Sequence, residues 1–212
     1  MKLDKRGLLI VLSGPSGVGK GTVRSALFEM EGHDLVYSVS MTTRAPRKGE
    51  VDGREYYFVS REEFLKRIAD GKFLEYAEFV NNYYGTPIDA VEKQLEEGKE
   101  VVLEIEVQGA LQVREKMKDD AIFIFIAPPS MSDLYDRLRT RGTESVEILK
   151  ARCEKARREV ELAYLYDYIV VNDTVENAAD KIMAIIRAEH AKTDRAISEY
   201  KKLLLIGEDE DC

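Results

Sequence analysis

A glycine-rich segment near the N-terminus has the spacing of a phosphate-binding loop. It follows a short apolar run, residues 8–13, and precedes residues 22–31, which we predict to be helical. Glycines let backbone N–H groups converge on phosphate oxygens, and a lysine at the end of the loop reaches the β- and γ-phosphates. A strand-to-helix turn without a ligand has no use for that lysine. We expect these residues to bind a nucleoside triphosphate: Gly14, Pro15, Ser16, Gly17, Val18, Gly19, Lys20, Gly21 and Thr22.

The residue after the lysine departs from the general form of this motif. That form has serine or threonine there, and its hydroxyl binds Mg²⁺. In this chain Gly21 takes the position and Thr22 follows it. Because Mg²⁺ gives up its water reluctantly, we expect nucleotide phosphates and water to hold it, with no direct ligand assigned to the protein.

A polar and aromatic segment downstream carries side chains suited to a second phosphate group. Arg44 and Arg47 lie three residues apart, and Tyr56 and Tyr84 are phenols in the same segment. The planar guanidinium group of arginine matches two phosphate oxygens at once. A solvated basic loop is the other interpretation of these residues taken alone.

Three further arginines have the chemistry to meet a phosphoryl group. Arg137 and Arg141 lie four apart on one face of a predicted helix, and Arg152 is expected to begin the next helix. Like charges on one face repel, so the face is either solvated or turned toward an anion. Beside a phosphate loop, such arginines would stabilise a phosphoryl group in transfer and help to exclude water.

Two carboxylates stand at the end of an apolar run over residues 101–105. Side chains alternate along a strand, so Glu104 and Glu106 are expected to project in the same direction. Open α/β sheets bind ligands at the carboxyl ends of their strands. Contact with substrate or metal-bound water is therefore one interpretation, and pairing with structural arginines is the other.

The elements that must position these residues follow an α/β pattern. Near-continuous apolar runs predict strands buried on both faces, and periodic segments between them predict helices. Ser60 with Glu63 forms a capping box, and Gly71 is expected just past the end of that helix. Pro87 is expected as the first residue of the next helix, which Gly98 closes. The predicted strands are residues 8–13, 101–105, 122–126 and 168–171, and the longer helices are 144–165 and 175–190.

One stretch, residues 39–85, breaks this rhythm because it is polar, aromatic and rich in turns. We interpret it as an inserted lobe with short strands. The predicted organisation is a single domain whose core comprises residues 1–38, 89–129 and 154–190. A lobe at 39–88, a lid at 130–153, and a C-terminal helix with an acidic tail at 191–212 complete it.

Composition narrows the class of protein. The chain has 212 residues, two cysteines, two histidines and a net charge of −8. It is long enough for a hydrophobic core, and no apolar run approaches the ~18 residues of a spanning helix. The acidic balance disfavours nucleic acid as a partner, and the scarcity of cysteine disfavours a disulfide framework. We expect a cytoplasmic enzyme without membrane or nucleic-acid partners.

With these residues in hand, the chain resembles the guanylate kinase family, most closely its bacterial type. The resemblance covers about residues 8–186 through GPSGVGKGT, SVSMTTRAPRKGEVDGREYYF, FLEYAEFVNNYYGTP, VVLEIEVQGA, IFIAPPS, RLRTRGT and VNDT. It implies a three-layer α/β/α core with a phosphate loop and a mostly parallel sheet. It also implies reversible, Mg²⁺-dependent transfer of the ATP γ-phosphoryl group to GMP, with dGMP as a further acceptor.

The resemblance assigns roles residue by residue. Lys20, Arg44, Arg137, Arg141 and Arg152 would be catalytic. Asn172 would lie near the adenine of ATP. The GMP site would comprise Ser40, Arg44, Arg47, Tyr56, Glu75, Tyr84, Gly85, Thr86, Glu104 and Glu106.

The chemistry of guanine agrees with this assignment. Guanine presents N1–H and N2–H₂ donors and the O6 acceptor on one edge. Glu75 would accept from both donors, and Thr86 would donate to O6. Adenine reverses the pattern and would leave buried polar groups unpaired.

Two alternatives belong to different classes. One is a kinase for another nucleoside monophosphate, and the other is a guanylate-kinase-like scaffold that binds proteins without catalysis. The intact loop lysine and the arginines disfavour the scaffold. Oligomeric state stays open, since the helical pattern over 180–202 suits either an interface between copies or a solvated face.

Overall fold

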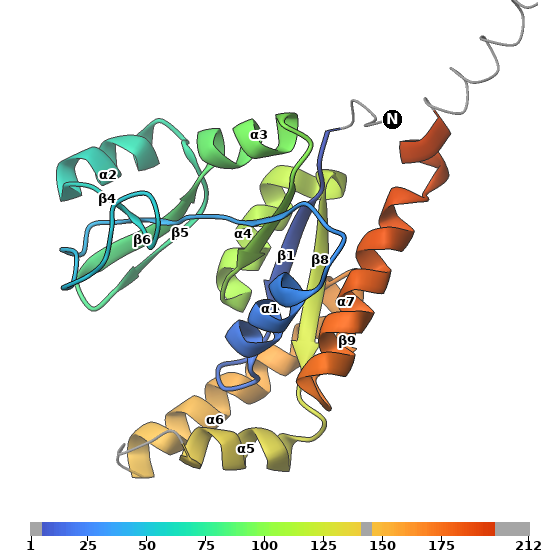
Figure 1. The fold of residues 1–212 in the computed structure, drawn as a ribbon. Coiled ribbons are helices and arrows are strands. Elements are labelled where there is room, and N and C mark those ends of the chain that lie inside the picture. Colours follow the sequence, from blue (N-terminus) through green and yellow to red (C-terminus); the bar gives the residue numbers. More distant parts are fainter. Residues whose placement is uncertain (1–5, 141–145, 198–212) are drawn as a thin grey trace, which may run out of the picture.

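The computed structural model describes residues 6–140 and 146–197. Their central feature is a parallel sheet in the order β2-β7-β1-β8-β9 (Figure 1). Every residue of its middle strand, β1, is buried, as expected for a near-continuous apolar run. The strand bounds are Leu35–Tyr37 for β2, Glu100–Glu104 for β7, Leu9–Ser13 for β1, Ala121–Ala127 for β8 and Tyr168–Val171 for β9. The four predicted strands are thus confirmed to within one residue at either end.

Helices cover both faces of this sheet, and alternate residues of β1 determine which face each helix meets. Ile10 and Leu12 pack with apolar residues of α1 (Lys20–Glu29) and α7 (Val175–His190). Leu9 and Val11 pack on the other face against α3 (Ile88–Glu96) and α4 (Val107–Met117). The predicted α/β class with a three-layer core and a mostly parallel sheet is confirmed.

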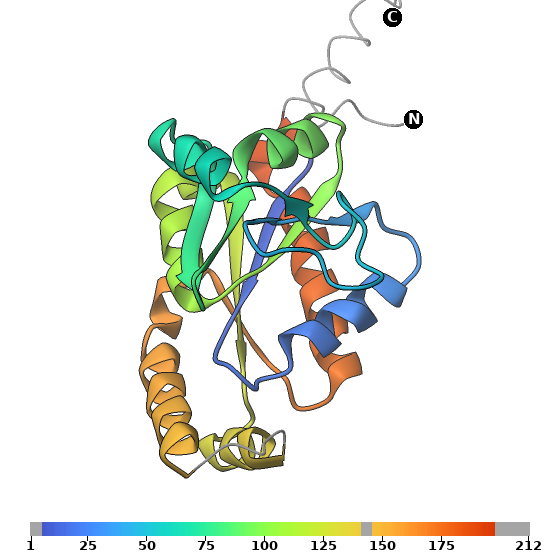
Figure 2. The same cartoon turned by 90° about the vertical axis from the view of Figure 1, so that its left-hand side faces the viewer.

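Residues 41–87 form a second sheet with a separate small core. Its strand order is β4-β3-β6-β5, and helix α2 (Arg61–Ala69) packs on it. Buried Met41, Phe64 and Phe73 form its core. The strand bounds are Met41–Thr42 for β3, Tyr57–Phe58 for β4, Phe73–Phe79 for β5 and Asn82–Pro87 for β6. This second sheet stands to one side of the central one in Figure 1 and lies in front of it in the turned view of Figure 2.

Helix boundaries confirm some local predictions and correct others. Ser60 accepts a hydrogen bond from the Glu63 backbone N–H at 3.1 Å, and Gly71 has φ +64°, both as predicted. Helix α3 begins at Ile88 rather than Pro87, because Pro87 is still paired with Phe73 in the sheet.

The phosphate-loop helix also begins earlier than its sequence suggests. Helix α1 starts at Lys20 instead of Thr22, because Gly19 adopts a left-handed conformation at φ +96° and turns the chain there. It ends at Glu29, where the chain turns extended at Met30, rather than at Glu31.

Two helices, α5 (Met131–Thr140) and α6 (Val146–Glu161), extend beyond the carboxyl end of the sheet. Arg152 lies within α6 and not at its start. A separate short turn, η2 (Ala163–Leu165), follows α6, so the predicted helix over 144–165 is divided where it is described. Helix α7 has its predicted bounds, 175–190. The continuous helical pattern over 180–202 is not confirmed where it is described, because the helix ends at His190 and a new helical segment covers residues 193–197. Within the described ranges no helix combines the length and apolar character needed to cross a membrane.

Packing in the small core predicts a large effect for one side chain. Phe64 is fully buried and stacks on Phe73 and Tyr83 at 4.4 and 5.4 Å between ring centroids. Phe64→Ala is expected to lower the free energy of unfolding by about 3–5 kcal/mol, measured by urea denaturation. Leu65→Ala, on the exposed face of the same helix, is the control and should cost under about 1 kcal/mol. Equal losses for the two variants would contradict this packing.

Candidate active site

The loop between β1 and α1 forms one wall of a pocket of about 270 Å³. Gly17 and Gly19 have φ +86° and +96°, which side chains with a Cβ rarely adopt. A Cβ on Gly14 would lie 2.3 Å from the Ile126 carbonyl oxygen of the neighbouring strand. The lining residues are Gly14, Ser16, Gly17, Gly19, Lys20, Gly21, Glu104, Ile105, Glu106 and Glu159. The loop therefore depends on glycine both for its conformation and for its fit against the sheet.

Lys20 is folded back along this loop. Its ammonium group donates to the carbonyl oxygens of Gly14 at 2.7 Å and Pro15 at 3.2 Å. Burial lowers the pKa of Lys20, and the nearby Glu104 opposes that shift. A partly desolvated ammonium group at the mouth of a loop of N–H donors is suited to a phosphate anion.

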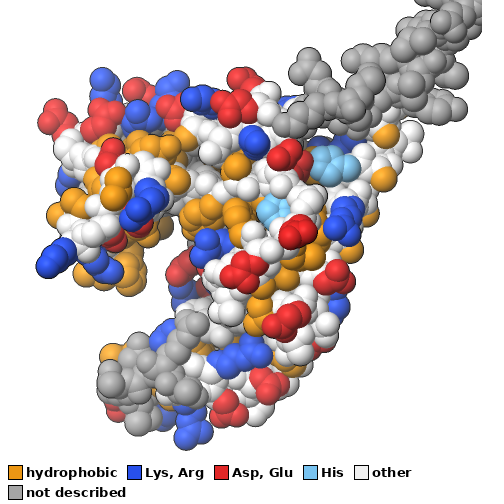
Figure 3. Space-filling view, viewed as in Figure 1, with side chains coloured by type: hydrophobic (Ala, Val, Ile, Leu, Met, Phe, Trp, Pro, Cys, Tyr) orange, Lys and Arg blue, Asp and Glu red, His pale blue; other side chains and the backbone are white. Residues whose placement is uncertain are grey.

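A second pocket, of about 420 Å³, lies between the small sheet and the core. It contains most of the residues predicted for the acceptor nucleotide: Ser40, Tyr56, Glu75, Tyr84, Gly85, Glu104 and Glu106. Glu104, Ile105 and Glu106 line both pockets, so the two pockets meet at the end of β7. Figure 3 shows the deep cleft between the small sheet and the α5–α6 pair.

Glu75 is a nearly buried carboxylate in the second pocket. Its Oε1 accepts a hydrogen bond from the Thr86 hydroxyl at 2.7 Å, and a Cβ on Gly109 would lie 3.0 Å from its Oε2. Burial raises the pKa of Glu75, and the hydrogen bond from Thr86 opposes that shift. Because the one hydroxyl proton of Thr86 is already donated to Glu75, Thr86 is not free to donate to a ligand in this arrangement.

The two arginines of the small sheet differ in their surroundings. Arg44 donates to both carboxylate oxygens of Glu50 at 2.9 and 3.0 Å, and its guanidinium lies 5.4 Å from the centre of the Tyr56 ring. The side-chain hydrogen bond from Arg44 holds the pKa of Glu50 below its usual value. Arg47 is exposed, and its backbone N–H also donates to Glu50. Glu50 therefore holds the Arg44 guanidinium, and neither arginine lines the second pocket.

Two predicted arginines contact the phosphate loop from the α5–α6 pair. Arg137 donates to the Val18 carbonyl oxygen at 3.1 Å and the Asn172 carbonyl oxygen at 3.3 Å. Arg152 donates to the Ser16 hydroxyl at 3.0 Å. Arg141, the third predicted arginine, lies outside the described residues.

Asn172 is buried and closes the other side of the loop, where its side chain donates to the Val18 carbonyl oxygen at 2.8 Å. Together with Arg137, Gly17, Gly19 and Thr22 it lines a third pocket, of about 600 Å³. This pocket lies against the loop, on the side where Asn172 contacts it.

Several site residues were missed by sequence reasoning. Arg24 donates to Glu104 at 2.8 Å and lies 4.6 Å from the centre of the Tyr37 ring, so the arginine pairing considered for Glu104 is present. Lys155 pairs with Glu106 at 2.8 Å, and nearly buried Glu159 lines the loop pocket. A helical-face argument starting from Arg152 reaches both α6 residues, since they follow it by three and seven positions.

The donor groups at the loop also bear on a metal ion. Within residues 6–140 and 146–197 no three histidine, cysteine, aspartate or glutamate side chains are grouped so as to hold a metal. Glu104 and Glu106 do place carboxylates in the loop pocket, beside Gly21. The arrangement fits Mg²⁺ that keeps water and phosphate ligands, with these carboxylates beyond its water.

Comparison with known proteins agrees with this geometry. The family model described as guanylate kinase matches residues 6–189. The guanylate kinase of Aster yellows witches'-broom phytoplasma is 59% identical over 96% of this chain and 97% of its own length, and that of Bacillus subtilis is 57% identical over 95% and 98%. The crystal structure of guanylate kinase from Anaplasma phagocytophilum, 40% identical, superposes with a TM-score of 0.69 over 91% of each chain. The chain belongs to the guanylate kinase family.

Proposed function

We propose that this chain is an enzyme that transfers the γ-phosphoryl group of ATP to GMP and forms ADP and GDP. The observation that carries the proposal is that two pockets of different chemistry meet at Glu104 and Glu106. One contains a phosphate loop with its lysine, and the other contains a buried carboxylate able to read guanine. Membership of the guanylate kinase family supports the same reaction.

The donor nucleotide is assigned to the loop and to the third pocket. Backbone N–H groups of residues 16–22 and the Lys20 ammonium bind the phosphates of ATP, and Asn172 lies beside its adenine. Arg137 and Arg152 already contact the loop and would turn to the γ-phosphate when it arrives. Arg141 is assigned the same role on the grounds of sequence.

The acceptor nucleotide is assigned to the second pocket. Glu75 accepts from guanine N1–H and N2–H₂, and Ser40 contacts the same base. Thr86 orients Glu75 through their 2.7 Å hydrogen bond. We assign it this role in place of the one expected from the sequence, donation to guanine O6. Tyr56, Tyr84 and Gly85 line the pocket toward the GMP phosphate. To reach that phosphate the Arg44 guanidinium would leave Glu50, and the exposed Arg47 side chain would turn inward.

The reaction is a direct, in-line displacement. A phosphate oxygen of GMP attacks the γ-phosphorus, and the bond from that phosphorus to the β,γ-bridging oxygen breaks, so the electron pair leaves with ADP. The attacking oxygen is already anionic, so no general base and no covalent enzyme intermediate are needed. Catalysis is then positioning and neutralisation of charge by Lys20 and the arginines.

We assign Mg²⁺ to the nucleotide phosphates, with Glu104 and Glu106 beyond its water ligands. Bound Mg²⁺ would neutralise charge on the β- and γ-phosphate oxygens. Gly21 stands where related loops carry a hydroxyl ligand, so the protein's part is to orient water through carboxylates.

Removing the metal ion is expected to abolish turnover. With excess EDTA, ADP formation from ATP and GMP should fall to background, because Lys20 alone does not neutralise the phosphates in transfer. Excess Mg²⁺ added back should restore the full rate, which controls for damage to the enzyme. Unchanged turnover in EDTA would contradict the assignment.

Two parts of the chain are proposed to move toward the core: the lobe at residues 39–88 and the lid at residues 130–153. The separate core of the small sheet supports movement of the lobe as a unit. Closure driven by both nucleotides would bring the arginines to the γ-phosphate only when GMP is present, which limits hydrolysis of ATP. On the sequence grounds given above, the proposal places the enzyme in the cytoplasm.

A coupled ADP-release assay with GMP, dGMP, AMP, UMP and CMP tests the function. Rapid ADP formation with GMP, slower with dGMP, and background rates with the other three are expected. Faster turnover with another monophosphate would make the chain a kinase for that nucleotide. Background rates with all five acceptors would make it a non-catalytic member of the family.

A further inference from the structure

The loop pocket contains an excess of carboxylates for a site that receives a polyphosphate. Glu104, Glu106 and Glu159 line it, whereas Lys20 is its one lysine or arginine lining residue in the described part of the chain. A triphosphate brings more negative charge, and like charges a few ångströms apart repel by more than thermal energy outside bulk water. Cations next to these carboxylates, in addition to Mg²⁺, would lower that repulsion.

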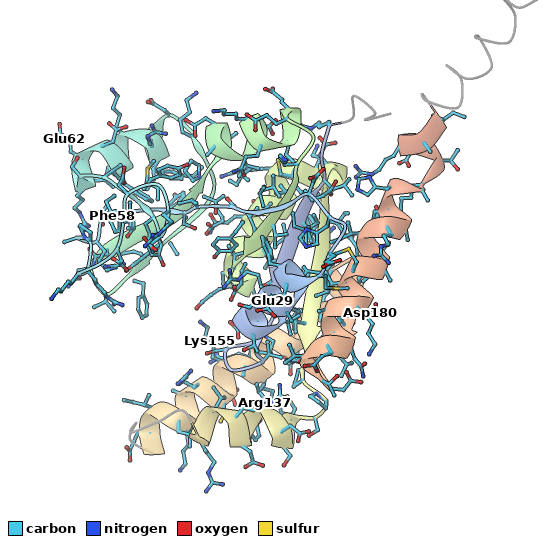
Figure 4. The ribbon with its side chains drawn as sticks, viewed as in Figure 1. Glu29, Phe58, Glu62, Arg137, Lys155 and Asp180 are labelled. Atoms are coloured by element: carbon cyan, nitrogen blue, oxygen red, sulfur yellow. The ribbon has the colours of Figure 1, made fainter. Side chains whose placement is uncertain are left out.

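Two cations outside the pocket lining supply this charge. Arg24 holds Glu104 at 2.8 Å. The Lys155 ammonium lies 2.8 Å from Glu106 Oε2 and 3.6 Å from Glu159 Oε1, so it serves two carboxylates at once. Figure 4 shows Lys155 on the part of α6 that approaches the core.

Glu159 depends most on this lysine. Its side chain is 7% exposed, and its Oε2 has no hydrogen-bond partner. Burial raises the pKa of Glu159, while the charge of Lys155 and a hydrogen bond from the Ser16 backbone oppose that shift. Arg152, on the same helix, donates to the Ser16 hydroxyl, so α6 contacts the phosphate loop beside Glu159. An unpaired, displaced Glu159 would disturb the loop directly.

Lys155 contacts a residue at the place where the loop pocket and the second pocket meet. Glu106 is the N-cap residue of α4 and lines both the loop pocket and the second pocket. Glu159 lines the loop pocket but not the second pocket. Building on the phosphoryl transfer proposed above, we propose that Lys155 is a positioning residue for the donor nucleotide. Its single positive charge is shared between Glu106 and Glu159, which fixes both carboxylates in place and lowers the repulsion that ATP meets at the loop.

The first test compares steady-state kinetics of Lys155→Met with those of the wild type. At saturating GMP the KM for ATP is expected to rise about tenfold, as for the loss of one unit charge close to a polyphosphate, while kcat changes less than about threefold. Arg157→Met removes a charge two residues away, on the opposite side of the same helix, and should leave both constants unchanged. Lys155→Arg, which keeps the charge, should recover most of the loss.

A double-mutant cycle, made of Lys155→Met, Glu159→Gln and the double variant, separates this role from general damage to the protein. In Lys155→Met/Glu159→Gln the unpaired buried carboxylate is gone, so the KM for ATP should return to within about threefold of the wild type. The proposal is overturned if Lys155→Met leaves the KM for ATP within twofold of the wild type, or if the second substitution recovers nothing. Absence of turnover in the wild type itself would instead overturn the proposed function.

Discussion

Lys20→Ala is expected to lower kcat by about 10²- to 10³-fold, the size of effect seen when one preorganised charge or donor is removed from a transition state. In the structure the Lys20 ammonium is held at the loop by two carbonyl oxygens, so it is already placed when ATP binds. Its charge matters most when negative charge develops between the β- and γ-phosphates. We therefore expect a larger change in kcat than in the KM for ATP.

The measurement is ADP release at saturating ATP and GMP, with ADP affinity by calorimetry to show that the loop still forms. Lys66→Ala is a matched control, since Lys66 is an exposed lysine on α2, the helix that packs on the small sheet. Lys20→Arg keeps the charge in a longer, planar group and should recover little. Turnover of Lys20→Ala within a few-fold of the wild type would refute the assigned role.

Local features of the site could be predicted from the sequence because short-range chemistry determines them. Gly17, Gly19 and Lys20 belong to one turn between a strand and a helix, and all three line the predicted loop pocket. Ser60 caps its helix through the N–H group three residues on. The loop turn and the helix cap each depend on residues close together in the chain, so a short sequence pattern is enough to predict them.

Long-range pairing could not be predicted in the same way. The contact of Arg24 with Glu104 joins residues 80 apart, and that of Lys155 with Glu106 joins residues 49 apart. Charged residues are numerous, and nothing in their order says which of them meet. Thr86 is a related case, since its hydroxyl was expected to face the ligand but donates across the small sheet to Glu75.

Glu75→Gln is expected to lower kcat/KM for GMP by at least about 10²-fold and to raise that for AMP. The carboxylate accepts from two guanine donors, whereas an amide must present one donor of its own to that edge. Glu62→Gln, an exposed glutamate on α2, is the control and should leave both values unchanged. The same assay with GMP and AMP measures the ratio, and an unchanged preference for GMP would remove Glu75 from the base site.

Acid pH provides an independent measurement of the same carboxylate. Because burial raises the pKa of Glu75, the wild type should lose GMP affinity as the pH falls toward that pKa, and Glu75→Gln should lack this dependence. Stability should move in the opposite direction. A raised pKa favours the neutral form in the folded state, so this group's stabilising contribution is complete at acid pH and is lost as the pH rises through the folded pKa. At neutral pH, thermal unfolding should therefore show that Glu75→Gln is at least as stable as the wild type. That result would mean that the buried carboxylate lowers stability and is retained because it recognises guanine.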